Sequence, residues 1–201
     1  MDRFDELDTV HSRVWRRLSE AAGEPGHPYR TLTFGTTQDG TPRLRTVVLR
    51  QVNRAARRLA FHSDRRAQKI HDIRATGRVA WQGWDPETAE QVRLAGTATV
   101  HTDDPVADAM WADQTPASLD VYVRPAAPGT PIDDQGEGVD PSVAEGPVTQ
   151  ADVEAGRPHF AVVRTVIDEI DWLHLHPEGH VRARFAYDAD AEAFDGTWIV
   201  P

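Results

Sequence analysis

The sequence contains no cysteine among its 201 residues, which excludes disulfide bonds, a thiolate nucleophile and cysteine-ligated zinc or iron–sulfur centres. It also lacks long apolar runs: no stretch approaches the roughly 18 apolar residues that a membrane-spanning helix needs. The first residues, Met1 to Glu6, are acidic and have no apolar segment of the kind found in secretory signals. We therefore expect a cytoplasmic protein that has no membrane partner.

Positive charge is scarce in total but concentrated in one segment. The net charge of −10 argues against a nucleic-acid partner. Residues 43–78 nevertheless hold 11 of the 22 basic residues and only two acidic ones, so this segment carries +9 and the rest of the chain −19. Such an island predicts the binding of a small anion such as a phosphate group, with a solvated arginine-rich surface as the alternative.

The hydrophobic pattern predicts a mainly β fold with peripheral helices. Alternating apolar residues predict strands, and apolar residues three or four apart predict helices. The expected strands are 30–36, 43–52, 58–62, 78–84, 91–101, 160–172, 181–187 and 198–200. The expected helices are 3–21, 65–75, one that begins at 103–105 with Val106, Ala109 and Met110 on its buried side, and 149–155. Because helices and strands do not alternate regularly, we expect an antiparallel sheet or barrel.

The whole chain, residues 1–201, is expected to form one domain, with the N-terminal helix inside residues 1–24. Residues 125–148 contain five prolines and four glycines. A loop of this length in a compact domain is usually a functional flap or a disordered segment.

The first segment that could carry chemistry is the strand that begins at Arg45 and ends at Arg50. Four residues, Thr46-Val47-Val48-Leu49, separate the two arginines. Residues five apart on a strand point to opposite faces, so the two guanidinium groups cannot serve one site through the same face. One of them could reach a phosphate, but a buried strand whose arginines extend to solvent would give the same pattern.

Two further segments could contact a nucleotide. Phe61-His62 ends a strand, and a helix follows at once with Lys69, the only lysine of the chain, in its first turns. Free N–H groups at a helix start favour a phosphate, although capping by Ser63 or Asp64 would also explain the sequence. Gln91 opens a strand and carries an amide that can both donate to and accept from the edge of a heteroaromatic ring.

Together these segments resemble the pyridoxamine 5'-phosphate oxidase-like family of FMN-binding split barrels. The resemblance extends over residues 27–201. It rests on the strand Arg45–Arg50, on Phe61-His62, on Ala67-Gln68-Lys69, on Gln91-Val92-Arg93-Leu94-Ala95-Gly96, and on Trp172 followed by His180–Phe185. It implies an antiparallel split β-barrel and a homodimer with FMN at its interface. It also implies an oxidoreductase that acts on an unidentified small molecule.

The resemblance also implies roles for individual residues. Arg45 and Lys69 would face the FMN phosphate, and Gln91 would bond to the flavin ring or its ribityl chain. Trp172 and Arg184 would reach the cofactor from the partner subunit. The backbone of Thr46, Val47, Val48 and Leu49 would border the isoalloxazine edge, and the neighbouring motif residues Arg50, Phe61 and His62 complete the predicted cofactor site.

Several positions depart from the pattern by which pyridoxamine phosphate oxidases hold their substrate. Arg50 replaces a lysine, Gln114 stands where an arginine is expected before Ser118, and the late Arg-x-His pair reads His180-Val181-Arg182. FMN binding is therefore better supported than turnover of pyridoxamine phosphate. A genuine pyridoxamine 5'-phosphate oxidase and a non-catalytic flavin carrier or sensor are the alternatives. No catalytic residue is assigned, and His62 and His180 are candidates only because histidine titrates near neutral pH.

Two other clusters suggest competing sites. His174 and His176 share a strand face and, with His180, could chelate a metal, but no carboxylate is placed as a further ligand, so we expect no metal. Asp168, Glu169 and Asp171 resemble a pair of catalytic carboxylates. Because adjacent strand residues diverge in direction, we interpret this cluster as a solvated edge.

Overall fold

The computed structural model describes residues 4–133, 135 and 148–201. The contacts divide the chain into two compact units. Unit 1 comprises Met1–Phe61, Thr76–Ala98 and Arg164–Pro201, and unit 2 comprises His62–Ala75 and Thr99–Val163. Most of the predicted loop 125–148 (residue 134 and residues 136–147) lies outside the described residues.

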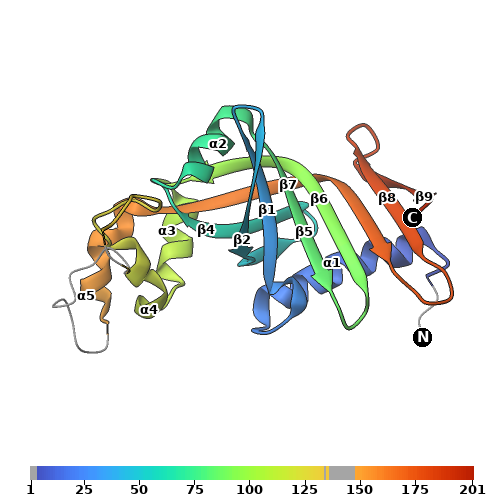
Figure 1. The fold of residues 1–201 in the computed structure, drawn as a ribbon, viewed down its shortest axis with the longest axis horizontal. Helices are drawn as coiled ribbons and strands as arrows, with labels where there is room; N and C mark the ends of the chain where they lie inside the picture. The colour runs from blue at the N-terminus through green and yellow to red at the C-terminus, as the bar shows by residue number, and fades with distance from the viewer. Residues whose placement is uncertain (1–3, 134, 136–147) are drawn as a thin grey trace. The chain divides into compact units, whose positions relative to one another are not determined.

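The protein is mainly antiparallel β sheet with peripheral helices, as the sequence predicts (Figure 1). The strands are β1 (Thr31–Gln38), β2 (Thr41–Val48), β3 (Gln51–Asn53), β4 (Arg58–Asp64), β5 (Arg78–Asp85), β6 (Glu90–His101), β7 (Phe160–His174), β8 (Val181–Asp188) and β9 (Ala193–Ile199). Their order in the sheet is β2-β1-β5-β6-β7-β4-β3, with β8 paired to β7 and β9 paired to β8. In unit 1 the long helix α1 (Leu7–Gly23) is followed by a short 3-10 helix, η1 (Pro28–Arg30).

Strict alternation of buried and exposed residues gives the unit 1 sheet an inner and an outer face. Along β5, Val79 and Trp81 are buried, whereas Ala80, Gln82 and Trp84 are exposed. On the inner face, the rings of Phe34, Phe61 and Trp81 pack edge to face with centroids 4.8–5.5 Å apart. This aromatic cluster forms the centre of the core and leaves the outer face of the sheet available for ligands.

The prediction of one continuous strand over residues 43–52 is wrong at its end. β2 stops at Val48, and β3 begins at Gln51. At the break the chain changes partners: Leu49 N donates to Arg30 O at 2.9 Å, and the next amide, Arg50 N, donates to Ala60 O at 2.9 Å. The chain therefore bends at Leu49 and Arg50 as it passes from β1 to β4. The hydrophobic periodicity of the sequence does not reveal such a bend.

Unit 2 contains the remaining helices and a small aromatic cluster. These are α2 (Gln68–Thr76), α3 (Pro105–Ala112), α4 (Pro116–Leu119), η2 (Asp120–Tyr122), α5 (Gln150–Val153) and η3 (Glu154–His159). The rings of Trp111, Tyr122 and Phe160 meet with centroids 5.1–6.2 Å apart. Within the described ranges no helix combines the length and apolar character needed to cross a bilayer.

The start of α3 is as predicted, but its buried side is not. The side chain of Asp104 caps the helix by accepting from the backbone N–H groups of Val106 and Ala107. The fully buried positions are Ala107 and Trp111, whereas Val106 and Met110 are half-buried and Ala109 is exposed. The tryptophan sets the orientation of this short helix because it contributes more apolar surface to the core than the other residues of α3.

Candidate functional site

A groove of about 400 Å³ lies on the outer face of the unit 1 sheet. This volume is within the roughly 300–1,000 Å³ that is usual for small-molecule sites. Two rows of side chains, aligned across β2, β1, β5 and β6 by the strand register, form much of its floor. The first row is Leu44, Gly35, Ala80 and Ala95, and the second is Thr33, Gln82 and Arg93; Thr46 is the cross-strand partner of Thr33 and lies just outside the lining. The small residues of the first row keep the floor low, so a flat group can approach the backbone.

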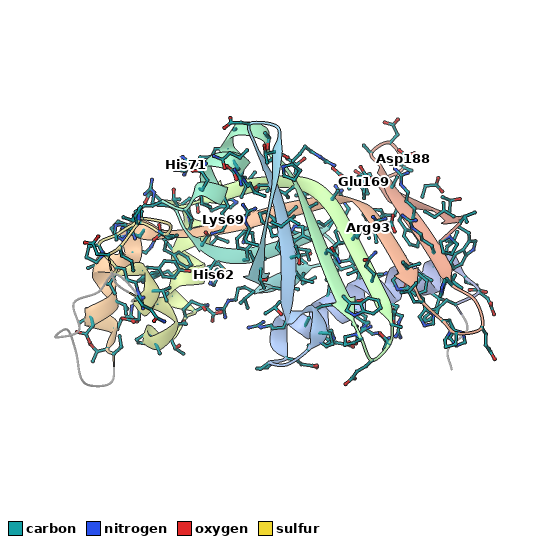
Figure 2. All side chains as sticks on the ribbon, viewed as in Figure 1. His62, Lys69, His71, Arg93, Glu169 and Asp188 are labelled. Atoms are coloured by element: carbon teal, nitrogen blue, oxygen red, sulfur yellow. The ribbon has the colours of Figure 1, made fainter. Side chains whose placement is uncertain are left out.

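The far wall of the groove is charged, and its charges are paired. Arg93 Nη2 lies 2.5 Å from Asp171 Oδ2, and Arg182 bonds to the same carboxylate through Nε at 3.1 Å and Nη2 at 2.9 Å. Arg184 lies beside Glu169 at 3.6 Å. Arg93 and Glu169, labelled in Figure 2, come from β6 and β7. With three guanidinium groups and two carboxylates, the lining favours an anionic ligand.

The interpretation of Asp168, Glu169 and Asp171 as a solvated edge holds only in part: Asp168 and Glu169 are partly exposed, but all three carboxylates are paired with arginines. Asp168 accepts from Arg78 at 2.5 Å, and Asp171 is held between Arg93 and Arg182. Burial alone would raise the pKa of Asp171, but the hydrogen bonds from its two arginines outweigh burial and lower it. Asp171 and Glu169 are therefore counter-ions of the groove arginines, whereas Asp168 pairs with Arg78 outside the groove lining.

A third pair of side chains continues the floor toward the end of the β5–β6 hairpin. Trp84 and Gln91 are direct cross-strand partners, one step beyond Gln82 and Arg93. Gln82 Nε2 donates to Gln91 Oε1 at 3.4 Å. Val48, which is exposed on β2, shares the outer face with Thr46. Three predicted ring contacts, Thr46, Val48 and Gln91, therefore lie on one face of unit 1.

The side chains of Arg45 and Val47 in β2, and of Leu49 just after it, lie on the opposite side from Thr46 and Val48. Val47 and Leu49 are buried in the core, as is Phe61 of β4. Arg45 is half-buried, and its Nη1 donates to Thr36 Oγ1 at 2.7 Å and to Arg43 O at 2.9 Å. Arg50 lies beyond β2, in the bend before β3. Because Arg50 is not part of β2, the opposite orientations expected for Arg45 and Arg50 on one strand stay a prediction.

Trp172 lies inside unit 1. Its side chain is fully buried, and its Nε1 donates to Glu90 Oε2 at 2.8 Å. The ring of Phe4 packs edge-on against it with centroids 4.9 Å apart. Trp172 therefore supports the β5–β6 hairpin from within its own subunit. Arg184, by contrast, is exposed at the groove.

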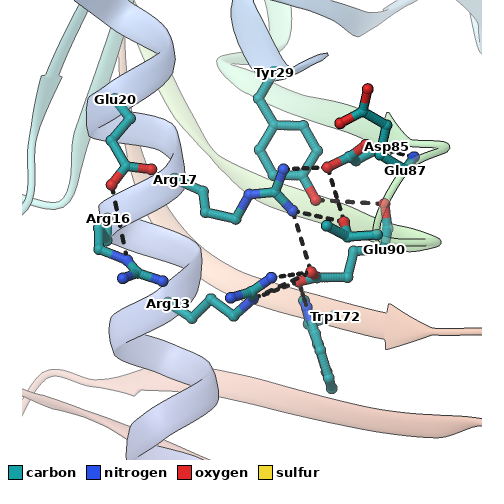
Figure 3. A network of polar contacts seen from close by, with 10 residues as sticks. Arg13, Arg16, Arg17, Glu20, Tyr29, Asp85, Glu87, Glu90 and Trp172 are labelled. Carbon is teal, nitrogen blue, oxygen red and sulfur yellow. Dashed lines mark hydrogen bonds and ion pairs between the residues drawn. The ribbon is translucent and has the colours of Figure 1, made fainter. Parts of the chain in front are cut away.

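Glu90 and Asp85 belong to a buried ion-pair network that joins α1 to the β5–β6 hairpin (Figure 3). Arg13 reaches Glu90 with contacts of 2.5–3.1 Å, and Arg17 Nη1 reaches the same carboxylate at 3.2 Å. Arg17 Nη2 also bonds to Asp85. Because Asp85 and Glu90 are partners at the two ends of the turn, Arg17 holds both ends together.

The network keeps both carboxylates ionised. Burial would raise the pKa of Glu90, but hydrogen bonds from Arg13 and Trp172 outweigh it and hold the pKa below its ordinary value. Burial likewise opposes ionisation of Asp85, yet Arg17 and Thr88 lower its pKa to about 2. The hairpin end is thus fixed by charge as well as by packing.

In unit 2 a helix follows β4, but it begins at Gln68 and not at the predicted Arg65. The predicted capping by Asp64 is not observed: Asp64 ends β4, accepts from Arg66 N at 2.7 Å in the turn before the helix, and binds the Arg66 guanidinium. Arg65 lies 3.1 Å from Asp103. Lys69 Nζ donates to the buried Ser63 hydroxyl at 3.1 Å. The half-buried His62 packs against Phe160 with ring centroids 5.0 Å apart.

The competing histidine site finds no support in the described part of the chain. No group of three or more histidine, aspartate or glutamate side chains there could hold a metal ion. His174 is buried beside Phe4 and Trp172, and burial lowers its pKa. His180 is exposed at the start of β8.

Sequence reasoning missed Trp84 and the arginines of α1. The signal for Trp84 was its place on the outer face, two residues beyond Gln82 in an alternating strand. Arg13 and Arg17 are four residues apart and so share one side of α1, but a sequence does not reveal their partners 68–77 residues away.

Comparison with known proteins places this geometry in context. Residues 12–102 match the family model "Pyridoxamine 5'-phosphate oxidase, FMN-binding domain". A search of the curated proteins gives no match. Among solved structures, a pyridoxamine 5'-phosphate oxidase-related, FMN binding protein from Nostoc punctiforme is 25% identical with a TM-score of 0.73, and the match covers all of both chains. PhzG from Burkholderia lata, in complex with tetrahydrophenazine-1-carboxylic acid, is 16% identical with a TM-score of 0.67 over all of this chain and 95% of its own.

Proposed function

The chain belongs to the pyridoxamine 5'-phosphate oxidase-like split-barrel family, and from this premise we propose that it binds FMN and acts as an oxidoreductase on a small molecule. The observation that carries the proposal is the outer face of unit 1. There Thr46, Val48 and Gln91 share one side of the sheet with a groove that has a low floor and an excess of positive charge.

The residues present fit FMN. A flat ring suits a floor built on Gly35, Ala80 and Ala95, and fixed amides at Gln82 and Gln91 suit the polar edge of an isoalloxazine. When bound, FMN supplies the redox chemistry through its N5. The chain orients the ring, shields it from water and neutralises its phosphate.

Arg45 and Lys69, each taken by itself, are the residues proposed to hold the phosphate; Arg45 lies on the side of β2 opposite Thr46 and Val48, so it would contact the phosphate and not the ring. A phosphate dianion favours guanidinium and ammonium partners, and Lys69 is already oriented by its bond to Ser63. Thr46 to Leu49 would border the ring through their backbone, which agrees with the burial of the Val47 and Leu49 side chains. Trp172 would act indirectly, by supporting the hairpin that carries Gln91. Arg184 would contact the FMN bound to the partner subunit.

A homodimer with FMN at its interface completes the proposal. Leu44 is 72% exposed and Val48 36% exposed on the outer face of β2. Apolar side chains grouped beside a charged groove are typical of a protein interface. Light scattering on the purified protein measures its oligomeric state. A monomer at micromolar concentration in the presence of FMN would contradict the proposed homodimer.

Turnover of pyridoxamine phosphate is the weaker alternative. Arg182, which stands in the altered late motif, is already bonded twice to Asp171, so it is not available to hold a substrate phosphate. A steady-state assay with pyridoxamine phosphate separates this alternative from an oxidoreductase with another substrate. A flavoprotein that is reduced by no tested donor would favour a carrier or sensor.

The decisive first experiment is a cofactor test. Purified protein is expected to carry the visible absorbance of oxidised flavin, or to take up added FMN with saturable quenching of the flavin emission. A colourless protein that shows no saturable binding at millimolar FMN would refute the proposed function.

A further inference from the structure

The β5–β6 hairpin ends in an aromatic residue that neither the core nor the ion-pair network uses. Trp84 is 42% exposed on the outer face of the sheet. Its cross-strand partner is Gln91, and the next pair inward, Gln82 and Arg93, lines the groove. The indole therefore lies on the same face of the sheet as the groove, two residues along β5 from Gln82 and beyond the residues that line the groove.

This hairpin end is held on its opposite face. The pair next to Trp84 and Gln91 is Asp85 and Glu90, which points inward and is 2% and 1% exposed. Arg17 binds both carboxylates, and the backbone carbonyl of Glu90 accepts from the Tyr29 hydroxyl at 3.4 Å. Successive strand residues face opposite sides, so fixing one pair inward fixes the other pair outward.

The turn itself is also fixed. Asp85 accepts from the Glu87 amide at 2.9 Å and from the Thr88 hydroxyl at 2.8 Å. The carbonyl of Ala89 accepts from Leu175 N, just beyond β7, at 2.9 Å. A hairpin tip is ordinarily mobile, whereas this tip is tied to α1, to its own loop and to the end of β7. An exposed ring on such a rigid support loses little conformational entropy when it binds a ligand.

We propose that Trp84 is a ring-stacking residue of the flavin site, with Gln91 and Gln82 as hydrogen-bonding neighbours along the ring edge. This inference rests on the proposed function and adds a contact residue to it. Stacking of a planar heteroaromatic ring on an indole is favourable because both faces are apolar and polarisable. The adjacent amides supply the donors and acceptors that an indole lacks.

The test uses the full-length protein loaded with FMN and three variants. Trp84→Ala removes the ring, Trp84→Phe keeps an aromatic face, and Trp198→Ala is the matched control. Trp198 is 39% exposed on β9, and its cross-strand partner is the buried Ala183, so it faces away from the groove residues Arg182 and Ile199. The readouts are the Kd for FMN, the emission of the bound flavin, which an indole in stacking contact quenches, and the oligomeric state by light scattering.

We expect Trp84→Ala to raise the Kd for FMN about tenfold or more, as loss of one stacking partner does for nucleobases. The emission of bound FMN should rise in Trp84→Ala and in Trp84→Phe, while Trp84→Phe keeps its Kd within about threefold of the parent. Trp198→Ala should match the parent in both measurements.

Unchanged Kd and emission in Trp84→Ala would overturn the inference and leave the proposed function standing. The inference would also be overturned by a loss of FMN binding in Trp84→Ala that tracks dissociation into monomers, because Trp84 would then act through the subunit contact. A parent protein that fails to bind FMN would overturn the proposed function together with this inference.

Discussion

The indole of Trp172 donates a hydrogen bond of 2.8 Å to the carboxylate of Glu90, and both side chains are almost inaccessible to water. The bond links β7 to the end of the β5–β6 hairpin. Since Glu90 also receives two arginines of α1, three elements far apart in the sequence meet at one carboxylate.

Removal of the indole donor should destabilise unit 1. Trp172→Phe keeps most of the ring but leaves one lone pair of Glu90 without its donor, at a cost of about 1–3 kcal/mol in the free energy of unfolding. Urea unfolding followed by circular dichroism measures it. A direct flavin contact would instead leave unfolding of the FMN-free protein unchanged.

Replacement of the Glu90 carboxylate should lower the free energy of unfolding more than Trp172→Phe does. Glu90→Ala removes the carboxylate that Arg13 and the buried Arg17 share, although Arg17 keeps its bond to Asp85. Breaking a buried ion pair in this way is expected to cost about 3–5 kcal/mol. Glu87→Gln, on an exposed residue of the same turn, is the control and should unfold like the parent. Equal effects of the two variants would show that the network contributes nothing to stability.

Stability should fall in acid because of Asp85. Its pKa is lowered from 3.8 to about 2 in the folded chain, since Arg17 and Thr88 outweigh the effect of burial. A carboxyl group with a depressed pKa stabilises the fold above the unfolded-state pKa and loses this contribution as the pH falls through the folded-state value. About 2 kcal/mol should therefore disappear between roughly pH 4 and pH 2.

Urea titrations at several pH values measure this dependence. Asp85→Asn should be less stable than the parent at pH 7 and should show a flatter dependence below pH 4. Parallel curves for the two proteins would exclude Asp85 as the titrating group.

Loss of either proposed phosphate ligand should weaken FMN binding. Arg45→Ala and Lys69→Ala each remove a charge-assisted hydrogen bond of about 1.5–3 kcal/mol, which corresponds to roughly ten- to a hundredfold in Kd. Arg43→Ala and Arg74→Ala are matched controls, because both residues are exposed on the same elements, β2 and α2. If both test variants bind FMN as the parent does, the phosphate assignment is wrong.

Gly96 should tolerate no side chain. A Cβ at this position would lie 2.1 Å from the backbone oxygen of Val166, because β6 and β7 approach closely there. Gly96→Ala must displace a strand, and we expect a loss of at least about 1–3 kcal/mol in the free energy of unfolding. Gly23→Ala meets nothing within 4 Å and should be close to neutral, so equal melting temperatures of the two variants would contradict the prediction.

The sequence alone was sufficient for the fold class, because apolar alternation indicated strands such as β5 and β6. It gave no prediction of the face of the sheet on which Gln91 lies. The residues at which the chain changes partners were not predictable, since the bend at Leu49 and Arg50 depends on Arg30 and Ala60 as acceptors.

The partners of the charged side chains could not be predicted from the sequence either. Periodicity indicates which face a carboxylate occupies but not which arginine it meets. Asp171 was therefore expected to be solvated although it lies between Arg93 and Arg182. The predicted cap at Asp64 shows this limit too: its carboxylate bonds to Arg66 in the turn after β4, and the helix begins only at Gln68.

The bonds from α1 to the hairpin bear on where the chain can be shortened. The match to the family model begins only at residue 12, inside α1. In the described part of the chain, however, Arg13 and Arg17 of this helix are the only cations bonded to Glu90 and Asp85. A truncated protein that started at residue 25 would keep every strand and lose both counter-charges. Crystallographers and engineers who trim flexible leaders should therefore treat this helix as part of the domain and place affinity tags at the other terminus.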